Sequence, residues 1–308
     1  MLISLTKNLQ PLFNSQQKTC IGLLCLIILA TSAESAPVHN QTSDLEQNIN
    51  TYIRGLRTQG VIDDDETTAW SVYDFTSHQK LVSINEDIPH QSASMIKPFV
   101  GLAYFYQLKE NPKKYRYTQK RRWQIQAMLN HSSNSATNYF IDLVGHASHN
   151  PPLRVETILK TQAPDIFRQT AIVEHIPANG KTYRNLASAR DYSRFLYALW
   201  HDRFPFSQEL KRLMSLPNAD RMIDGVEQIP EGTIVYDKTG TTARLCGNMG
   251  IIEAQGKNGD SYPYTFIAII EKRHSAKNFG DWIARRGQLI RTISGMVYST
   301  MKKRYNLK

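Results

Sequence analysis

The stretch SMIKPFVGLAYFY, residues 94–106, begins with a serine and a lysine three residues apart and continues as an apolar run. Pro98 suits the first turn of a helix, where its missing N–H costs nothing. Because residues three apart share a helix face, we expect the Ser94 hydroxyl beside the Lys97 amine. A serine hydroxyl needs a base within hydrogen-bond reach to act as a nucleophile. The stretch therefore predicts a nucleophile and its base at the start of an apolar helix.

The Ser-x-x-Lys pattern is weak alone, because it also begins at Ser4, Ser15, Ser77 and Ser299. The first two copies lie in an N-terminal segment of signal-peptide type. Ser77 falls in a predicted hairpin turn, and Ser299 in a predicted C-terminal helix. Only Ser94 begins an apolar helix after a polar loop, and this context singles it out.

The order of residue types in residues 1–36 is typical of a secretory signal peptide. Lys7 and Lys18 precede the apolar run 21–30, and small residues follow it. The run is too short for a comfortable transmembrane span, so we prefer a cleaved signal to an uncleaved anchor. We therefore expect a signal peptide at 1–36, one catalytic domain at 37–308, a periplasmic or secreted location, and no stable membrane span after cleavage.

Cleavage would leave Cys246 as the one cysteine, so we expect no internal disulfide and a small buried or half-buried thiol. The formal net charge of +10 is compatible with nucleic acid or with anionic polymers of the cell envelope. The basic residues 113–122 accompany no nucleic-acid-binding signature, which favours a solvated basic face and no nucleic-acid partner.

The chain reads as an α+β protein. Strands are predicted at 69–75, 80–84, 250–254 and 264–270, with a further strand leading to Lys238. Because strands lie near both ends, we expect one antiparallel sheet that joins N-terminal and C-terminal strands. Ser43 and Glu46 form a capping-box pattern before the first helix. Helical periodicity and capping predict helices at 45–56, 94–110, 122–129, 139–144, 153–159, 188–200, 208–214 and 282–301.

Two further motifs follow Ser94 and Lys97 in order, Ser132-x-Asn134 and Lys238-Thr239-Gly240. This ordered trio resembles the penicillin-recognising serine hydrolases, namely class A β-lactamases and the related penicillin-binding D,D-peptidases. The resemblance extends from about residue 43 to residue 304. It implies their fold, in which helices pack on an antiparallel sheet and form a helical subdomain beside it.

The chemistry of each motif residue can be reasoned in turn. Ser94 would attack a carbonyl and form an acyl-enzyme, with Lys97 as its base. Burial beside the cation Lys238 would lower the pKa of Lys97 and favour its neutral form. Ser132 and Asn134 alternate, so an extended loop would point both the same way. Ser132 would pass a proton to the leaving nitrogen, and Asn134 would hold a substrate amide.

The remaining site residues concern substrate binding. Lys238 and Thr239 would bind a substrate carboxylate, and Gly240 belongs to the same group. The resemblance implies an oxyanion hole formed by the backbone N–H groups of Ser94 and Thr241. Arg244 is a candidate second anchor for the carboxylate. Asn138 matches the family asparagine that braces the loop before the deacylating residue.

The chain departs from the family in that loop, where Glu-x-x-Leu-Asn is absent. Glu174 is the one carboxylate between Asp165 and Asp191, which makes it the local candidate for activating water, with Asn179 as a candidate partner. A solvated Glu174 is the alternative. Ser133 replaces the usual aspartate of the middle motif, and the stretch from Ser94 to Ser132 is shorter than usual. The helical half is therefore expected to be trimmed.

Other chemistries lack their signatures. There is no Gly-x-Ser-x-Gly elbow, no His-Glu-x-x-His and no phosphate-binding glycine loop, so we expect neither metal nor cofactor. Three hypotheses remain: a β-lactamase, a D,D-peptidase acting on peptidoglycan stem peptides, and a non-catalytic envelope-binding or β-lactam-sensing module. The expected partner is a β-lactam or a peptidoglycan peptide, bound by a monomer.

Overall fold

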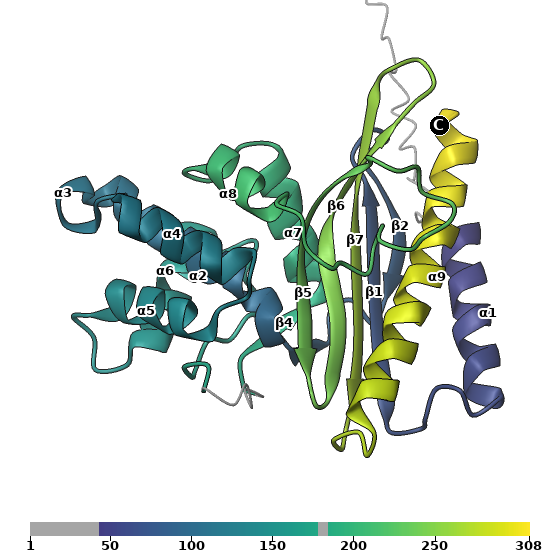
Figure 1. Ribbon diagram of the computed structural model, residues 1–308, viewed down its shortest axis with the longest axis horizontal. Helices are drawn as coiled ribbons and strands as arrows, with labels where there is room; N and C mark the ends of the chain where they lie inside the picture. The colour runs from purple at the N-terminus through teal and green to yellow at the C-terminus, as the bar shows by residue number, and fades with distance from the viewer. Residues whose placement is uncertain (1–42, 178–183) are drawn as a thin grey trace, which may run out of the picture. The chain divides into compact units, whose positions relative to one another are not determined.

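The computed structural model describes residues 43–177 and 184–308. Its centre is a five-stranded antiparallel sheet in the order β2-β1-β7-β6-β5 (Figure 1). The N-terminal strand β1 pairs along its length with the C-terminal strand β7. The α+β class and the predicted joining of the two ends of the chain in one sheet are thus confirmed. The strands are β1 (Glu66–Asp74), β2 (Gln79–Ile84), β5 (Ile234–Thr242), β6 (Leu245–Gln255) and β7 (Ser261–Lys272).

Both faces of this sheet are covered, which explains why its central strands are apolar nearly throughout. On β7, alternate residues enter different cores, because successive side chains of a strand point to opposite faces. Phe266 and Ala268 belong to one core cluster, and Ile267 and Ile269 to the other. The helices α1 (Asp44–Thr58) and α9 (Phe279–Tyr305) cover one face, as Figure 1 shows.

The capping box predicted at the start of α1 forms only in part. The Ser43 hydroxyl accepts the N–H of Glu46 at 3.1 Å, as a helix N-cap does. The Glu46 carboxylate instead accepts the backbone N–H of Ser83 on β2 at 2.6 Å. This side chain therefore fastens α1 to the sheet rather than closing the box.

The helical half covers the other face and surrounds α2, in which twelve successive residues from Lys97 to Leu108 are buried. Because α2 is buried on every side, its apolar residues are not confined to one face of the helix. The sequence did not predict the short α3 or the small sheet of β3 and β4. The elements of this half are α2 (Lys97–Glu110), α3 (Pro112–Tyr115), α4 (Gln119–Leu129), α5 (Asn134–Gly145), α6 (Pro151–Gln162), α7 (Ala189–Trp200), α8 (Ser207–Met214), β3 (Pro89–Gln91) and β4 (Leu186–Ser188).

Composition alone predicts a solvated loop for the acidic run Asp63-Asp64-Asp65-Glu66, but the structure corrects this prediction. Glu66 begins β1, is buried, and pairs with the buried Arg286 of α9 at 2.8 Å. Lys272 of β7 reaches Asp63 at 2.6 Å, Asp65 at 2.8 Å and Glu66 at 3.4 Å. The run therefore ties the first strand to the last strand and the last helix.

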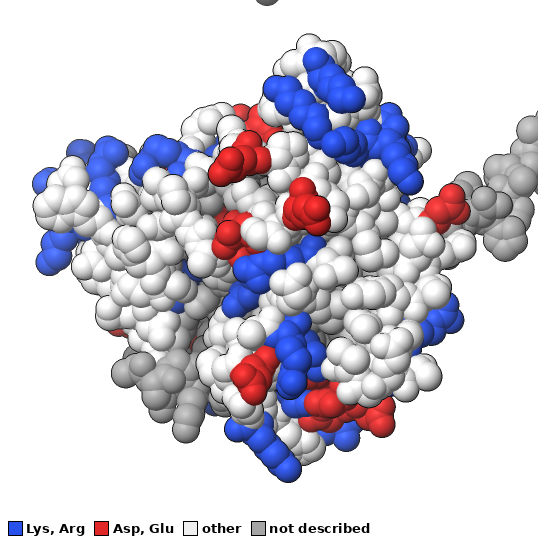
Figure 2. Space-filling model, turned by 45° about the vertical axis from the view of Figure 1, so that its right-hand side comes forward, with Lys and Arg blue, Asp and Glu red and all other residues white. Residues whose placement is uncertain are grey.

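Lys and Arg side chains gather over the end of the helical half where α3 and α4 lie (Figure 2). Within the described residues, Lys113, Lys114, Lys120 and Arg122 are exposed and form no ion pair. Cys246 is buried and free, as predicted. No helix among the described residues is long and apolar enough to cross a membrane. The predicted signal segment 1–36 lies outside the described residues.

Candidate active site

Ser94 lies in a short 3₁₀ helix, Ala93–Ile96, that leads directly into α2. This helix packs against β5 and β6 through Met95, whose side chain is fully buried. A Cβ at Gly240 would lie 2.9 Å from Met95 Cγ, and one at Gly247 would lie 2.8 Å from Met95 Cε. A side chain at Gly247 would displace the end of the Met95 side chain, and one at Gly240 would press on Met95 nearer to the backbone of the 3₁₀ helix. The glycine of Lys238-Thr239-Gly240 therefore lets the strand approach the turn that carries Ser94.

Lys97 is the first residue of α2 and is fully buried. Its Nζ donates to Ser132 Oγ at 3.0 Å, to Asn134 Oδ1 at 2.9 Å and to the Ser132 carbonyl oxygen. The structure thus brings the first two motifs together. In the described part of the chain, the Ser94 hydroxyl has no hydrogen-bond partner, so the direct contact between Ser94 and Lys97 expected from their spacing is not formed. Catalytic hydrogen bonds are often long before substrate binds.

The middle motif reaches Lys97 by a different route from the extended loop that its alternation predicted. Ser132 has a φ of 56°, in the left-handed region, and Asn134 is already the first residue of α5. Between them, the Ser133 hydroxyl accepts the N–H of Ala136 at 3.2 Å and caps the helix. Serine, like aspartate, is a good N-cap residue, so Ser133 can fill this position of the middle motif.

The electrostatics of this cluster favour a neutral lysine. Burial, together with the nearby charge of Lys238, lowers the pKa of Lys97 to about 7. Burial also lowers the pKa of Lys238, to about 8, although Asp237 opposes that shift. The two lysines thus titrate in a similar range. A neutral Lys97 has one proton fewer to donate and gains a lone pair that can accept the proton of a hydroxyl.

Lys238 and Thr239 lie on β5 opposite Met249 and Asn248 of β6. The neighbouring Asp237 is buried and accepts hydrogen bonds from Asn248 at 2.7 Å and Asn218 at 2.8 Å. Burial raises the pKa of Asp237 to about 6, against the effect of these two hydrogen bonds. The strand therefore carries a buried acidic residue directly before its motif lysine.

Arg221 is a site residue that the sequence did not reveal. Its Nη2 donates to Thr241 Oγ1 at 2.9 Å, and its Nη1 donates to the Gly247 carbonyl at 3.1 Å. Its charge also contributes to the lowered pKa of Lys238. Arg221 comes from an irregular segment before β5, where neither periodicity nor spacing marks it. It brings a guanidinium to the end of the Lys238-Thr239-Gly240 strand.

Arg244 lies in the two-residue turn between β5 and β6. Its Nε donates to the Lys272 carbonyl at 3.2 Å, and its Nη2 lies 3.9 Å from Glu271 Oε1. These contacts attach Arg244 to the end of β7. Arg221, whose guanidinium bonds Thr241 and the Gly247 carbonyl, is a further candidate for a carboxylate anchor beside Arg244.

The Glu174 carboxylate accepts the backbone N–H of Arg184 at 3.0 Å and lies 3.5 Å from Arg184 Nε. Its backbone N–H and carbonyl both bond the Asn185 side chain, at 3.1 and 3.0 Å. Asn138 forms two hydrogen bonds with the backbone of Ile176, at 2.7 and 2.8 Å, and so attaches the Glu174 segment to α5. Asn179 lies outside the described residues.

Among the described residues, no group of three or more His, Cys, Asp or Glu side chains is arranged to hold a metal ion. The site instead assembles a serine on a 3₁₀ turn, a buried lysine of lowered pKa, and a second serine within reach of that lysine. A strand bearing cations lies beside them. This fold and this set of side chains define the class of penicillin-recognising serine hydrolases.

Residues 122–300, more than half of the chain, match the model of the beta-lactamase enzyme family, and the chain belongs to that family. The matched range contains Ser132, Asn134 and the Lys238-Thr239-Gly240 strand, while Ser94 and Lys97 precede it. No curated protein sequence matches the chain significantly.

Solved structures with the same fold include PBP-A, with a TM-score of 0.65 and 18% identity over 84% of this chain and 96% of that one. A PBP-A mutant in an acyl-enzyme complex with penicillin G has a TM-score of 0.64 and 19% identity, over 83% of this chain and 97% of that one. A class A beta-lactamase from Bacteroides cellulosilyticus has a TM-score of 0.63 and 18% identity, over 84% and 99% of the two chains. At these identities, the similarity establishes the fold alone.

Proposed function

We propose that this chain is an exported serine hydrolase that opens the amide bond of β-lactams through an acyl-enzyme on Ser94. The observation that carries the proposal is the buried Lys97 amine. Its pKa is about 7, and it is hydrogen-bonded to Ser132 and Asn134. Strongly shifted pKa values cluster at functional sites, so the lowered pKa of Lys97 supports a role as a base.

The proposed acylation begins when neutral Lys97 takes the Ser94 proton, directly or through the Ser132 hydroxyl. Ser94 Oγ attacks the ring carbonyl carbon, and the backbone N–H groups of Ser94 and Thr241 stabilise the resulting oxyanion. The ring C–N bond then breaks. Its nitrogen receives a proton from Ser132, which the Lys97 ammonium replaces. The acyl group remains on Ser94 as an ester.

Substrate binding would use the cations along β5. The charged form of Lys238, together with the Thr239 hydroxyl and the Arg221 guanidinium, would bind the carboxylate that penicillins and peptidoglycan stems both carry. Asn134 would bond the side-chain amide of the substrate. The reaction would need neutral Lys97 and charged Lys238 at the same time. The pKa of Lys97 would therefore set the lower limit of the working pH range, and the pKa of Lys238 the upper limit.

Deacylation decides between this function and a second candidate, a D,D-peptidase acting on peptidoglycan stem peptides. The Glu174 carboxylate, which accepts the backbone N–H of Arg184 and lies 3.5 Å from Arg184 Nε, is the candidate group whose role in deacylation separates the two functions. A peptidase would keep a penicilloyl adduct for long times and would release D-alanine from a stem peptide. Export and a monomeric state remain predictions.

Intact-mass spectrometry after mixing with penicillin G, followed over time, tests these proposals. The wild type is expected to gain one penicilloyl group, and Ser94→Ala to gain none. A transient adduct that persists in Glu174→Gln would assign deacylation to Glu174. A long-lived adduct of equal lifetime in both proteins would favour the peptidase. The absence of any adduct on the wild type would contradict acylation altogether.

A further inference from the structure

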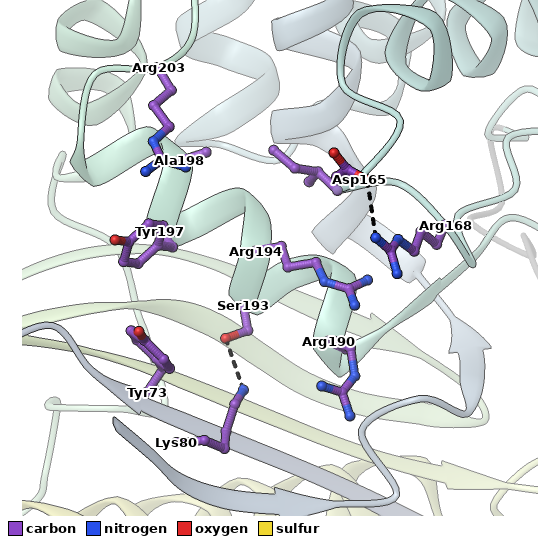
Figure 3. Close-up of a pocket in the computed structure, with 11 residues that line it drawn as sticks. Tyr73, Lys80, Asp165, Arg168, Arg190, Ser193, Arg194, Tyr197, Ala198 and Arg203 are labelled. Carbon is purple, nitrogen blue, oxygen red and sulfur yellow. Dashed lines mark hydrogen bonds and ion pairs between the residues drawn. The ribbon is translucent and has the colours of Figure 1, made fainter. Parts of the chain in front are cut away.

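A cavity of about 380 Å³ lies between α7, the first two strands and the segment that follows α6. Its wall includes four arginines, one lysine and one carboxylate, Asp165 (Figure 3). Three further carboxylates outside the wall, those of Glu86, Asp87 and Asp191, pair with cations of the wall. The cavity borders β1 and β2, whereas Ser94 packs against β5 at the opposite edge of the sheet. It is therefore separate from the catalytic site. The cations of its wall are Lys80, Arg168, Arg190, Arg194 and Arg203.

Three guanidinium groups point into one end of this cavity, those of Arg168, Arg190 and Arg194 (Figure 3). Arg168 pairs with Asp165, whose side chain is 90% exposed, so that pair is well screened by water. Arg190 is anchored from behind by the buried Glu86 at 2.9 Å. Arg190 also donates through Nε and Nη2 to Asp87, so two carboxylates hold the guanidinium and only its Nη1 has no hydrogen bond among the described residues.

Arg194 has donor capacity that the described residues do not use. Its Nη1 is buried without a hydrogen-bond partner, and it lies 3.5 Å from Asp191 Oδ1, beyond good hydrogen-bond distance. The pKa of Arg194 is lowered by burial and by the nearby charge of Arg168, with a further contribution from Arg190. Asp191 and Asp87 oppose that shift, so carboxylates offset part of this positive charge. An anion would be held by the hydrogen-bond donors that remain on Arg168 and Arg194.

The other end of the cavity carries two tyrosines, with the Arg203 guanidinium 5.1 Å from the centroid of the Tyr197 ring. Tyr73 and Tyr197 meet edge to face, with their ring centroids 5.5 Å apart, and both are half-buried. Ile166 and Ala198 also line the cavity. Lys80 reaches Ser193 Oγ at 3.2 Å between the two ends. A ligand that fills the cavity would place a flat or apolar body against the tyrosines and an anionic group among the arginines.

We propose that this cavity binds an organic phosphate monoester, with its phosphate among Arg168, Arg190 and Arg194 and its body against Tyr73 and Tyr197. Several guanidinium groups around one point suit a phosphate better than a single carboxylate, because their remaining N–H donors can reach several phosphate oxygens at once. The volume is in the range of small-molecule sites. The phosphate could belong to a soluble metabolite or to the headgroup of a lipid.

Isothermal titration calorimetry of the full chain in phosphate-free buffer at pH 7.5 tests the proposal. Phenyl phosphate is the soluble probe, inorganic phosphate tests the anion alone, and vesicles containing phosphatidic acid test a lipid headgroup. We expect phenyl phosphate to bind at a ratio of one to one, and more tightly than inorganic phosphate. Failure of phenyl phosphate and of the vesicles to bind would overturn the proposal.

The variants are chosen to leave the fold intact. Arg168→Gln removes a guanidinium that is 55% exposed and pairs only with Asp165 three residues earlier. Arg212→Gln is the matched control, because Arg212 is 53% exposed and pairs in the same way with Glu209, outside the cavity. We expect Arg168→Gln, and Arg194→Gln in parallel, to weaken binding about tenfold or more, and the control to leave it unchanged.

The outcomes separate the two sources of phosphate. Tight binding of phenyl phosphate that Arg168→Gln weakens supports a soluble phosphate ester. Vesicle binding weakened by the same variant, with phenyl phosphate bound poorly, supports a lipid headgroup. Equal effects of Arg168→Gln and Arg212→Gln would show that the ligand responds only to the general surface charge. That result would overturn the proposal. Acylation of Ser94 is not needed for any of these readouts, so the result is independent of the proposed catalytic function.

Discussion

Lys97 combines two properties that the sequence suggested separately. It was expected to be close to Ser94 because of spacing, and to have a low pKa because of burial beside Lys238. The structure supports the lowered pKa of Lys97. It does not show the expected contact with Ser94, because the Lys97 amine bonds Ser132 and Asn134 instead. Spacing along a helix cannot predict this, because the partners come from a loop about 35 residues later that reaches Lys97 only in the folded chain.

The first prediction concerns the pH dependence of acylation. Lys97 has a lowered pKa of about 7 and is therefore neutral, and able to act as a base, above that pH. Lys238 has a lowered pKa of about 8 and keeps the charge that binds a carboxylate only below it. The second-order rate of acylation by a fluorescent penicillin should therefore be greatest between about pH 7 and 8 and fall on both sides. A rate that is constant from pH 6 to 9 would contradict both roles.

The second prediction concerns the glycine of the third motif. Gly240→Ala places a methyl group 2.9 Å from Met95 Cγ, so the turn that carries Ser94 must move. We expect a loss of about 1–3 kcal/mol in the free energy of unfolding and a slower acylation of Ser94. Urea denaturation and the fluorescent penicillin assay measure the two effects.

Gly55→Ala is the control for that variant. Gly55 lies inside α1, and a Cβ there meets nothing within 4 Å. We expect this variant to gain about 0.5–1 kcal/mol in stability, because alanine favours a helix interior, and to leave acylation unchanged. Equal losses of stability in the two variants would show that Gly240 has no special packing role.

At the scale of elements, the long helices and the central strands could be predicted because periodicity and caps are local signals. The β3–β4 pair could not be, because each strand has three residues and the pairing joins segments almost a hundred residues apart. The role of the acidic run was also missed. Its partners, Lys272 and Arg286, lie more than 200 residues later, and composition alone indicated a solvated loop.

The third prediction tests that ion-pair cluster. Glu66→Gln leaves Arg286, which is 2% exposed, without its charge partner. We expect the free energy of unfolding to fall by about 3–5 kcal/mol, as it does when one partner of a buried ion pair is removed. Asp64→Asn, in the same run but exposed and without an ion pair among the described residues, should change stability by less than about 0.5 kcal/mol. Chemical denaturation of both variants measures the difference.

At the scale of the whole molecule, the order of the three motifs was enough to predict the fold, because each occupies a fixed place around one site. Arg221 could not be predicted in this way, because it enters from an irregular segment and matches no motif of the sequence. The cationic cavity beside α7 was missed for the same reason. Its arginines come from separate segments, and only the folded chain places them around one space.

The central claim is that Ser94, activated by a neutral Lys97, takes an acyl group from a β-lactam. Peptide mapping after a short exposure to penicillin G at pH 7.5 tests it most directly. The predicted result is one opened penicillin on the peptide that contains Ser94, with no such modification in Ser94→Ala and far less in Lys97→Ala. An unmodified Ser94 peptide, or a modification that persists in Ser94→Ala, would contradict the account.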